Sequence, residues 1–114
     1  MRGAVVLLSV DRVARMARRH GERFLARAFA PEERAECEGR RAPERLAARL
    51  AAKAAARKAL PDLRPPLRAI RVLRGEGGAP RISVPGVPDS NLFVSLSHDG
   101  GVAAAAVFVE PGAP

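Results

Sequence analysis

The stretch "LAARLAAKAAARKAL", residues 46–60, decides the fold. Its alanines and leucines predict one long helix over roughly 44–60, which Pro61 stops because proline cannot continue a helix. The stretch contains no carboxylate and four cations: Arg49, Lys53, Arg57 and Lys58. Cations of this kind can hold a phosphate, but in enzymes they usually stand beside an acid that holds a metal ion. The helix therefore predicts an anion site without its usual metal partner.

The chain before this helix predicts one strand and two further helices. "GAVVLLSV" (3–10) is rich in valine and leucine, as a buried strand is. Asp11 then opens a basic helix with apolar residues at helical spacing: Val13, Met16, Ala17 and Phe24. Pro31 stands at a first helical position with two glutamates behind it, and acids suit the positive end of a helix, so a short second helix starts there.

The chain after the long helix predicts four strands. "LRAIRVLR" (67–74) alternates apolar and basic residues, and "RISV" (81–84) pairs back with it. "LFVSLS" (92–97) and "VAAAAVFV" (102–109) form a hairpin through a glycine turn. This order predicts an α+β domain in which an antiparallel sheet packs with three helices. We expect a single domain over 1–110 and a flexible tail at 111–114.

The charge and the cysteine content narrow the function classes. A net charge of +8 favours an acidic partner, which could be nucleic acid, a membrane surface or a protein. Four Phe and no Trp or Tyr give few stacking platforms for nucleic acid. Cys37 stands alone, so neither a disulfide framework nor a zinc pattern is possible within the chain. The apolar run at 5–10 is too short to span a bilayer, and we expect a cytoplasmic protein with no membrane partner.

Four stretches together resemble the holo-acyl-carrier-protein synthase family, the small trimeric phosphopantetheinyl transferases. They are "HGERFLARAFAPEE" (20–33), "RLAARLAAKAAARKAL" (45–60), "AIRVLRGEGGAPRISVPG" (69–86) and "FVSLSHDGGVAAAAVFV" (93–109). The resemblance implies a phosphopantetheinyl transferase-like fold and a homotrimer with sites between subunits. It also implies an activity, the magnesium-dependent transfer of the phosphopantetheine arm of coenzyme A to a serine of an acyl carrier protein.

The chain departs from this family where the family binds metal. Our alignment puts Val6 at the position of the family's Asp, at the end of its first strand, and Ala54 at the position of its Glu in the long helix. With both carboxylates gone, we expect no metal ligand. "PDLRPP" (61–66) replaces a glycine-rich loop, and its three prolines have no amide hydrogen to offer a phosphate. Asp99 follows His98, where a carboxylate would repel an anion.

Other family positions are retained, and the resemblance assigns them roles. The candidates for acid/base catalysis are His98 and Glu33. The candidates for binding the coenzyme or its phosphates are Arg49, Lys53, Lys58 and Arg64. The candidates for docking the acidic carrier protein, on the first helix, are Arg12, Met16 and Arg23. The docking surface is therefore better preserved than the chemical site.

Each of these residues also has a structural interpretation. His98 either shuttles a proton or makes an inert hydrogen bond at the hairpin end. Glu33 either acts as an acid or base or supplies the helix N-terminal charge, and we favour the second. Lys53 and Lys58 either bind phosphate or lie on a solvated helix face. We expect Asp11 to cap its helix rather than to replace a metal ligand.

Three hypotheses for function follow. The leading one is a diverged homologue that engages an acyl carrier protein without magnesium-dependent transfer, either non-catalytic or repurposed to act on a carrier-bound intermediate of a fatty-acid or polyketide pathway. Whether the chain is an enzyme stays open, and no cofactor is expected. The alternative is an active transferase with a rearranged metal site, which would need magnesium and coenzyme A. The second alternative is a basic nucleic-acid-binding protein.

Overall fold

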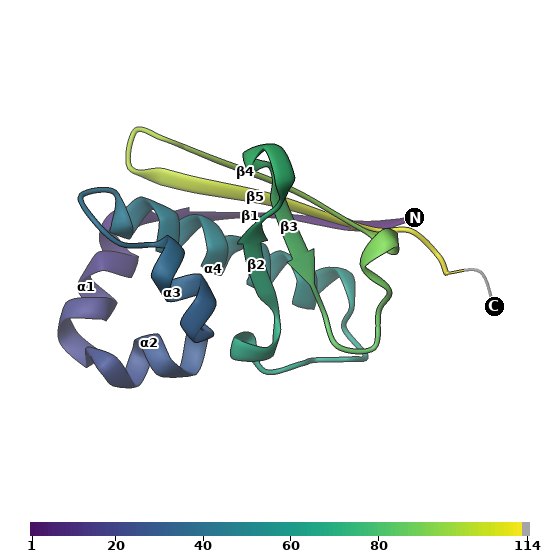
Figure 1. Ribbon diagram of the computed structural model, residues 1–114, viewed down its shortest axis with the longest axis horizontal. Helices are drawn as coiled ribbons and strands as arrows, with labels where there is room; N and C mark the ends of the chain where they lie inside the picture. The colour runs from purple at the N-terminus through teal and green to yellow at the C-terminus, as the bar shows by residue number, and fades with distance from the viewer. Residues whose placement is uncertain (113–114) are drawn as a thin grey trace.

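Three long antiparallel strands form the main sheet of the computed structural model, of which we describe residues 1–112 (Figure 1). Their order in the sheet is β1-β5-β4. A second, two-stranded sheet pairs β2 with β3. The strands are β1 (Arg2–Ser9), β2 (Arg71–Arg74), β3 (Pro80–Ser83), β4 (Leu92–Asp99) and β5 (Val102–Val109). The helices are α1 (Val10–His20), α2 (Glu22–Ala28), α3 (Pro31–Glu36) and α4 (Ala42–Ala59).

Helix α4 lies against one face of the main sheet, and its alanines form the centre of the core. Ala51, Ala52 and Ala55 are completely buried. They pack with Val6 of β1 and Val107 of β5 in one continuous hydrophobic cluster. Because alanine has only one side-chain carbon, the helix backbone can approach the strands closely. The alanine-rich stretch is therefore the element that the rest of the chain packs around.

The opposite face of the main sheet exposes large apolar side chains. Val5 and Leu7 of β1 are 62% and 66% exposed. Phe93 and Phe108 lie directly opposite each other on β4 and β5, and both are about half exposed. Gly3 pairs with Phe108 from the other side, and the aromatic ring occupies the space that a Cβ at Gly3 would fill. This apolar face consists of side chains from all three strands.

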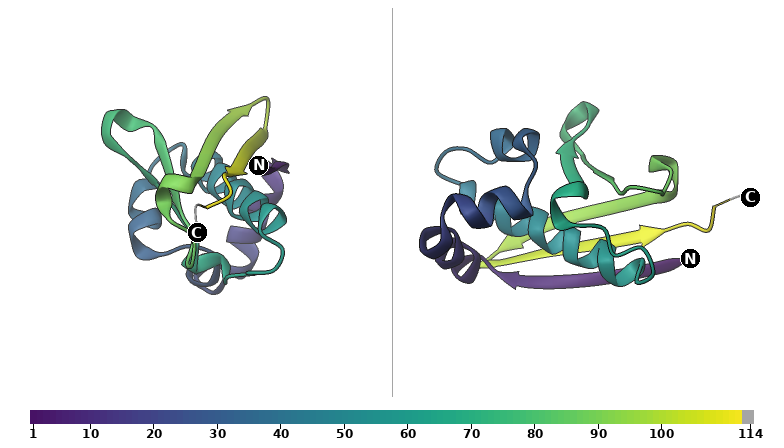
Figure 2. Two further views of the ribbon diagram at one scale, coloured as in Figure 1. Left: turned by 90° about the vertical axis from the view of Figure 1, so that its right-hand side faces the viewer. Right: turned by 90° about the horizontal axis from the view of Figure 1, so that it is seen from below.

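The structure confirms the α+β class and the four strands after α4, and it differs from the prediction in three places. The basic helix breaks at Gly21, whose φ of 55° favours glycine, so four helices replace the expected three. The strands form two sheets rather than one. The β2–β3 hairpin and the β4–β5 hairpin diverge from each other like the arms of a V (Figure 2). The predicted strand at 67–74 begins only at Arg71, after a 3-10 turn at Leu67–Ala69.

The cap of α1 is Ser9 rather than Asp11. The Ser9 hydroxyl oxygen accepts a hydrogen bond from the Arg12 backbone N–H at 3.2 Å. Asp11 lies in the first turn instead, where its carboxylate pairs with Arg15 four residues on, at 3.3 Å. The expected tail at 111–114 falls partly outside the described residues, which end at Gly112. None of the described helices is long and apolar enough to cross a membrane.

Strand β2 pairs with β3 along one edge only, and helix side chains satisfy its other edge. Two glutamates of α3 accept hydrogen bonds from its backbone N–H groups. Glu33 Oε2 accepts from the Val72 N–H at 2.9 Å. Glu36 Oε1 accepts from the Arg74 N–H at 3.0 Å. The spacing of three residues places both carboxylates on the same face of α3, toward alternate residues of the strand.

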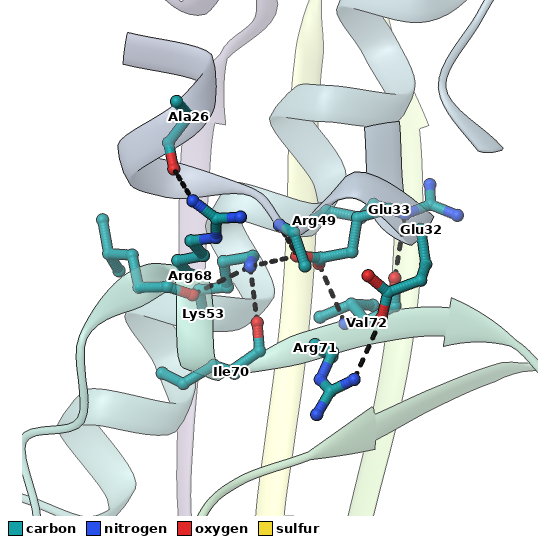
Figure 3. Close-up of polar contacts among 11 residues, drawn as sticks. Ala26, Glu32, Glu33, Arg49, Lys53, Arg68, Ile70, Arg71 and Val72 are labelled. Atoms are coloured by element: carbon teal, nitrogen blue, oxygen red, sulfur yellow. Dashed lines mark hydrogen bonds and ion pairs between the residues drawn. The ribbon is translucent and has the colours of Figure 1, made fainter. Parts of the chain in front are cut away.

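Two cations of α4 donate to the backbone carbonyls of the same edge (Figure 3). Arg49 Nε donates to the Val72 carbonyl at 3.0 Å. Lys53 Nζ donates to the Ile70 carbonyl. Again the helix spacing, here four residues, matches alternate strand residues. The backbone groups of this edge are therefore paired with side chains in place of a neighbouring strand, as buried backbone groups require.

Lys53 and Glu33 form a completely buried ion pair within this arrangement. Lys53 Nζ lies 2.6 Å from Glu33 Oε1, and both side chains have no exposed surface. The ammonium also donates to the carbonyls of Leu67, at 2.9 Å, and Ile70. Its three donors therefore have three acceptors. Burial lowers the pKa of Lys53 below its usual value, and the hydrogen bond to Glu33 opposes this shift. The pair joins α3, α4 and the start of β2.

We predict that Lys53→Met destabilises the protein by about 3–5 kcal/mol, because it leaves the Glu33 carboxylate buried without its cation. The double mutant Lys53→Met with Glu33→Gln should lose less than the sum of the single changes, because it removes both charges together. Urea unfolding of the three variants measures this. Lys58→Met is the control on the same helix, and because Lys58 is exposed it should change stability by less than about 0.5 kcal/mol. Equal effects at Lys53 and Lys58 would contradict the structural role.

Candidate functional site

Two of the predicted site residues have structural roles instead. Lys53 was expected to bind phosphate, but its ammonium is buried and its donors are all used within the protein. Glu33 was a candidate acid or base. Its Oε1 accepts from Lys53 and from the Ala30 N–H at 2.9 Å, and its Oε2 accepts from Val72. Both functional predictions are wrong in the described structure, because neither group is free to contact a ligand.

His98 and Arg49 line one cavity of about 200 Å³ between α4, β2 and β4. His98 is exposed near the end of β4. Arg49 is only 5% exposed. Two further arginines, Arg45 and Arg74, line the same cavity, together with Ser97. The prediction placed His98 and Arg49 at matching family positions, and the structure brings them together.

A second hollow adjoins His98 on its other side. It is lined by Arg40 and Arg41, with Glu44 and Asp99. Five arginines therefore line the two hollows that share His98. Sequence reasoning missed four of them: Arg40, Arg41, Arg45 and Arg74. The run "RRAPER" (40–45) was a signal of clustered charge, but nothing in the spacing indicated that it faces the hairpin. Guanidinium groups gathered in this way suit a phosphate better than they suit proton abstraction.

Lys58 and Arg64 lie together at a different place, at the C-terminal end of α4 and in the loop that follows it. They line a shallow hollow with Arg57 and Pro61. The Arg57 and Arg64 Nε groups donate to the carbonyls of Pro65, at 3.0 Å, and Pro61, at 3.1 Å. Nine residues of helix separate Lys58 from Arg49, or roughly 13 Å along the axis. The predicted phosphate ligands therefore form two groups on one subunit.

The expected metal position contains no carboxylate. Strand β1 continues to Ser9, so Val6 lies in the middle of the strand with its side chain in the core. The residue at the strand end is Ser9, three residues beyond Val6, and because the resemblance places the family's Asp at the strand end we consider Ser9 as well as Val6 for this position. Ala54 of α4 is partly buried and packs against the core. Within residues 1–112, no group of three or more His, Cys, Asp or Glu side chains could hold a metal ion. Ser9 offers one neutral oxygen and Ala54 offers none, so these two positions lack the carboxylates through which proteins usually bind magnesium.

The predicted docking residues lie on the exposed side of α1 and α2. Arg12, Met16 and Arg23 are all exposed, and Met16 is 43% exposed. Over the described part of the chain, neither Arg12 nor Arg23 is paired with a carboxylate, whereas Arg15 pairs with Asp11. Unpaired cations beside an exposed methionine form a surface that suits an acidic helix with an apolar stripe.

The comparisons with known proteins agree with this fold. The family model of the 4'-phosphopantetheinyl transferase superfamily matches residues 8–107. A holo-[acyl-carrier-protein] synthase of Anaeromyxobacter dehalogenans (strain 2CP-1) is 41% identical over 122 residues, covering 94% of this chain and 95% of the relative. The crystal structure of Helicobacter pylori holo-[acyl-carrier-protein] synthase in complex with coenzyme A superposes with a TM-score of 0.83 at 26% identity, covering 95% of this chain and 99% of the other.

A Mycobacterium tuberculosis acyl carrier protein synthase is 30% identical, with a TM-score of 0.73 and 97% of both chains covered. These matches extend over nearly the whole chain, so they include the sheet, α4 and the β2–β3 hairpin together. The chain therefore belongs to the 4'-phosphopantetheinyl transferase superfamily, and it has the α+β fold of the holo-acyl-carrier-protein synthases.

Proposed function

We propose that this protein binds coenzyme A and an acidic acyl carrier protein but does not transfer the phosphopantetheine arm by a magnesium-dependent route. The observation that carries the proposal is the pair Ser9 and Ala54, at the strand end and on α4 where the family resemblance places carboxylates. Magnesium in such a reaction neutralises the pyrophosphate as charge moves to the leaving oxygen. Ser9 and Ala54 supply no carboxylate for the ion, and these two positions alone are therefore a poor magnesium site.

Support for coenzyme A binding comes from the arginines around His98. The Helicobacter pylori relative binds coenzyme A, a ligand that carries a pyrophosphate and a separate ribose phosphate. The cavity at Arg49 and His98 offers buried and exposed cations to one such group. The hollow at Lys58 and Arg64 offers cations to another. The proposal differs here from the sequence-based expectation of no cofactor, because these cations have too few carboxylates beside them to neutralise their charge.

A catalytic role repurposed to other chemistry would depend on His98 alone. Glu33, the second candidate, is saturated by Lys53, Ala30 and Val72. His98 is exposed and shares its two hollows with arginines, whose guanidinium groups can orient an anion beside it. We therefore assign His98 to the coenzyme site and favour the non-catalytic form of the hypothesis.

We predict that the protein, incubated with coenzyme A, magnesium and an apo acyl carrier protein, leaves the carrier without its phosphopantetheine arm. Intact-mass spectrometry of the carrier measures this, and calorimetry should show that coenzyme A binds with or without magnesium. The double mutant Ser9→Asp with Ala54→Glu should acquire magnesium affinity, because it introduces two carboxylates. Efficient transfer by the unmodified protein would contradict the proposal and support the alternative, an active transferase with a rearranged metal site.

We predict that Arg12→Glu or Arg23→Glu weakens binding to an acidic carrier protein roughly 3- to 10-fold at low salt, mainly through slower association. The effect should shrink as added salt screens the exposed charges. Surface plasmon resonance across a salt series gives both rate constants. Arg81→Glu is the matched control, because Arg81 is exposed on β3 and belongs to neither α1 nor α2. If the affinity does not depend on these two arginines, the surface of α1 and α2 is not the docking site for the carrier protein.

We also propose that the apolar face of the main sheet joins copies of this chain into a homotrimer. A chain with a net charge of +8 repels its own copies, and the exposed side chains of Val5, Leu7, Phe93 and Phe108 carry no charge. Leu7→Glu should convert the assembly to monomer, because it buries an unpaired carboxylate in the interface. Light scattering after size exclusion measures the mass. Leu63→Glu, exposed away from the sheet, should leave the mass unchanged.

A further inference from the structure

We infer that Glu36 is a positioning residue that holds the Arg49 guanidinium in the orientation in which it binds an anion of the ligand. This inference rests on the proposed coenzyme A binding. It concerns a residue outside the set that the sequence indicated, and one that lines neither cavity at His98. Glu36 therefore acts through Arg49 and not by contact with the ligand.

The contacts of Arg49 carry the inference. Arg49 Nη2 lies 2.7 Å from Glu36 Oε1, and Arg49 Nε donates to the Val72 carbonyl at 3.0 Å. The Glu36 oxygen also accepts from the Arg74 N–H at 3.0 Å, so its own position is set by the strand. A guanidinium has five N–H donors, and these two bonds leave three of them. Among the described residues, Arg49 Nη1 donates to no protein acceptor, and Arg49 lines the His98 cavity.

The two acid–cation pairs on β2 differ in one respect that points to a ligand. The pair of Glu33 and Lys53 is closed, because both side chains are fully buried and the ammonium has no donor left. The pair of Glu36 and Arg49 has the same geometry one turn earlier on α4, but Glu36 is 29% exposed and Arg49 borders a cavity. The first pair maintains the fold. The second uses the same arrangement to present donors to the cavity.

Holding the Arg49 side chain in one orientation before the ligand arrives favours ligand binding, because an arginine that is free to move loses much rotamer freedom when it contacts a ligand. The other arginines of the cavity are held less firmly. Arg45 makes one exposed hydrogen bond, to the Glu38 carbonyl at 3.2 Å. The negative charge of Glu36 works against anion binding, so its contribution must come from its position as an acceptor. This distinction can be tested, because glutamine keeps the acceptor and removes the charge.

The experiment compares coenzyme A affinity by calorimetry, without magnesium, in the unmodified protein and in Glu36→Ala, Glu36→Gln and Glu32→Ala. Glu36→Ala should weaken binding roughly tenfold, because Arg49 and the Arg74 N–H lose their shared acceptor. Glu36→Gln should bind within about twofold of the unmodified protein or more tightly, because one amide oxygen can accept both bonds. Glu32→Ala removes the same charge from the same helix, but Glu32 pairs with Arg71 and not with Arg49. The affinity of this variant for coenzyme A should therefore be unchanged.

A double-mutant cycle with Arg49→Ala separates positioning from general destabilisation. If Glu36 acts through Arg49, Glu36→Ala should have little further effect on affinity once Arg49 is absent. An effect of the same size in both backgrounds, or a loss in Glu36→Gln as large as that in Glu36→Ala, would overturn the inference. Unmodified protein that binds no coenzyme A would instead overturn the proposed function, and the inference with it. Thermal unfolding of each variant confirms that the compared proteins are folded.

Discussion

The open edge of β2 is the constraint on which the rest of the structure depends. A strand with one neighbour leaves alternate N–H and C=O groups unpaired, and such groups are costly when buried. Here four charged side chains satisfy them, two from α3 and two from α4. This arrangement fixes the short α3 relative to α4 and the β2–β3 hairpin relative to the main sheet. The cavity at His98 lies between these elements, so its shape follows from the same contacts.

This constraint explains why a lysine at a family position is not evidence for chemistry in this chain. Lys53 stands in the helix between alanines, and its burial with Glu33 is a requirement of the fold. Replacing either partner would leave a buried charge without its counter-ion, which costs far more than an exposed pair contributes. Side chains that line a cavity, such as His98 and Arg49, are the ones that can contact a ligand.

The regular elements were predictable because their signals are local. The hairpin at 92–109 and the helix that Pro61 ends follow from alternation, turn glycines and proline chemistry. The break at Gly21 was missed because a single glycine inside an amphipathic pattern is compatible with one continuous helix. The burial of Lys53 could not be seen, because an alanine-rich helix with scattered cations has no distinct apolar face. Three of the four additional arginines come from the run 40–45 and the fourth is Arg74, so only the fold brings them to His98.

Ser9 and Ala54, the two positions without carboxylates, are also positions at which the absence of an acidic residue costs the fold little stability. Ser9 caps α1 with its hydroxyl, and serine and aspartate are about equally good at this position. Ala54 lies inside α4, where alanine has a higher helix propensity than glutamate. Neither substitution leaves a buried charge unpaired or opens a cavity in the core. Metal ligands can therefore be replaced here without destabilising the chain, whereas Glu33, Lys53, Glu36 and Arg49 cannot. Under the proposed function, the chain can therefore keep its fold and its arginine-lined cavity without carboxylates at these two positions, because stability does not oppose their absence.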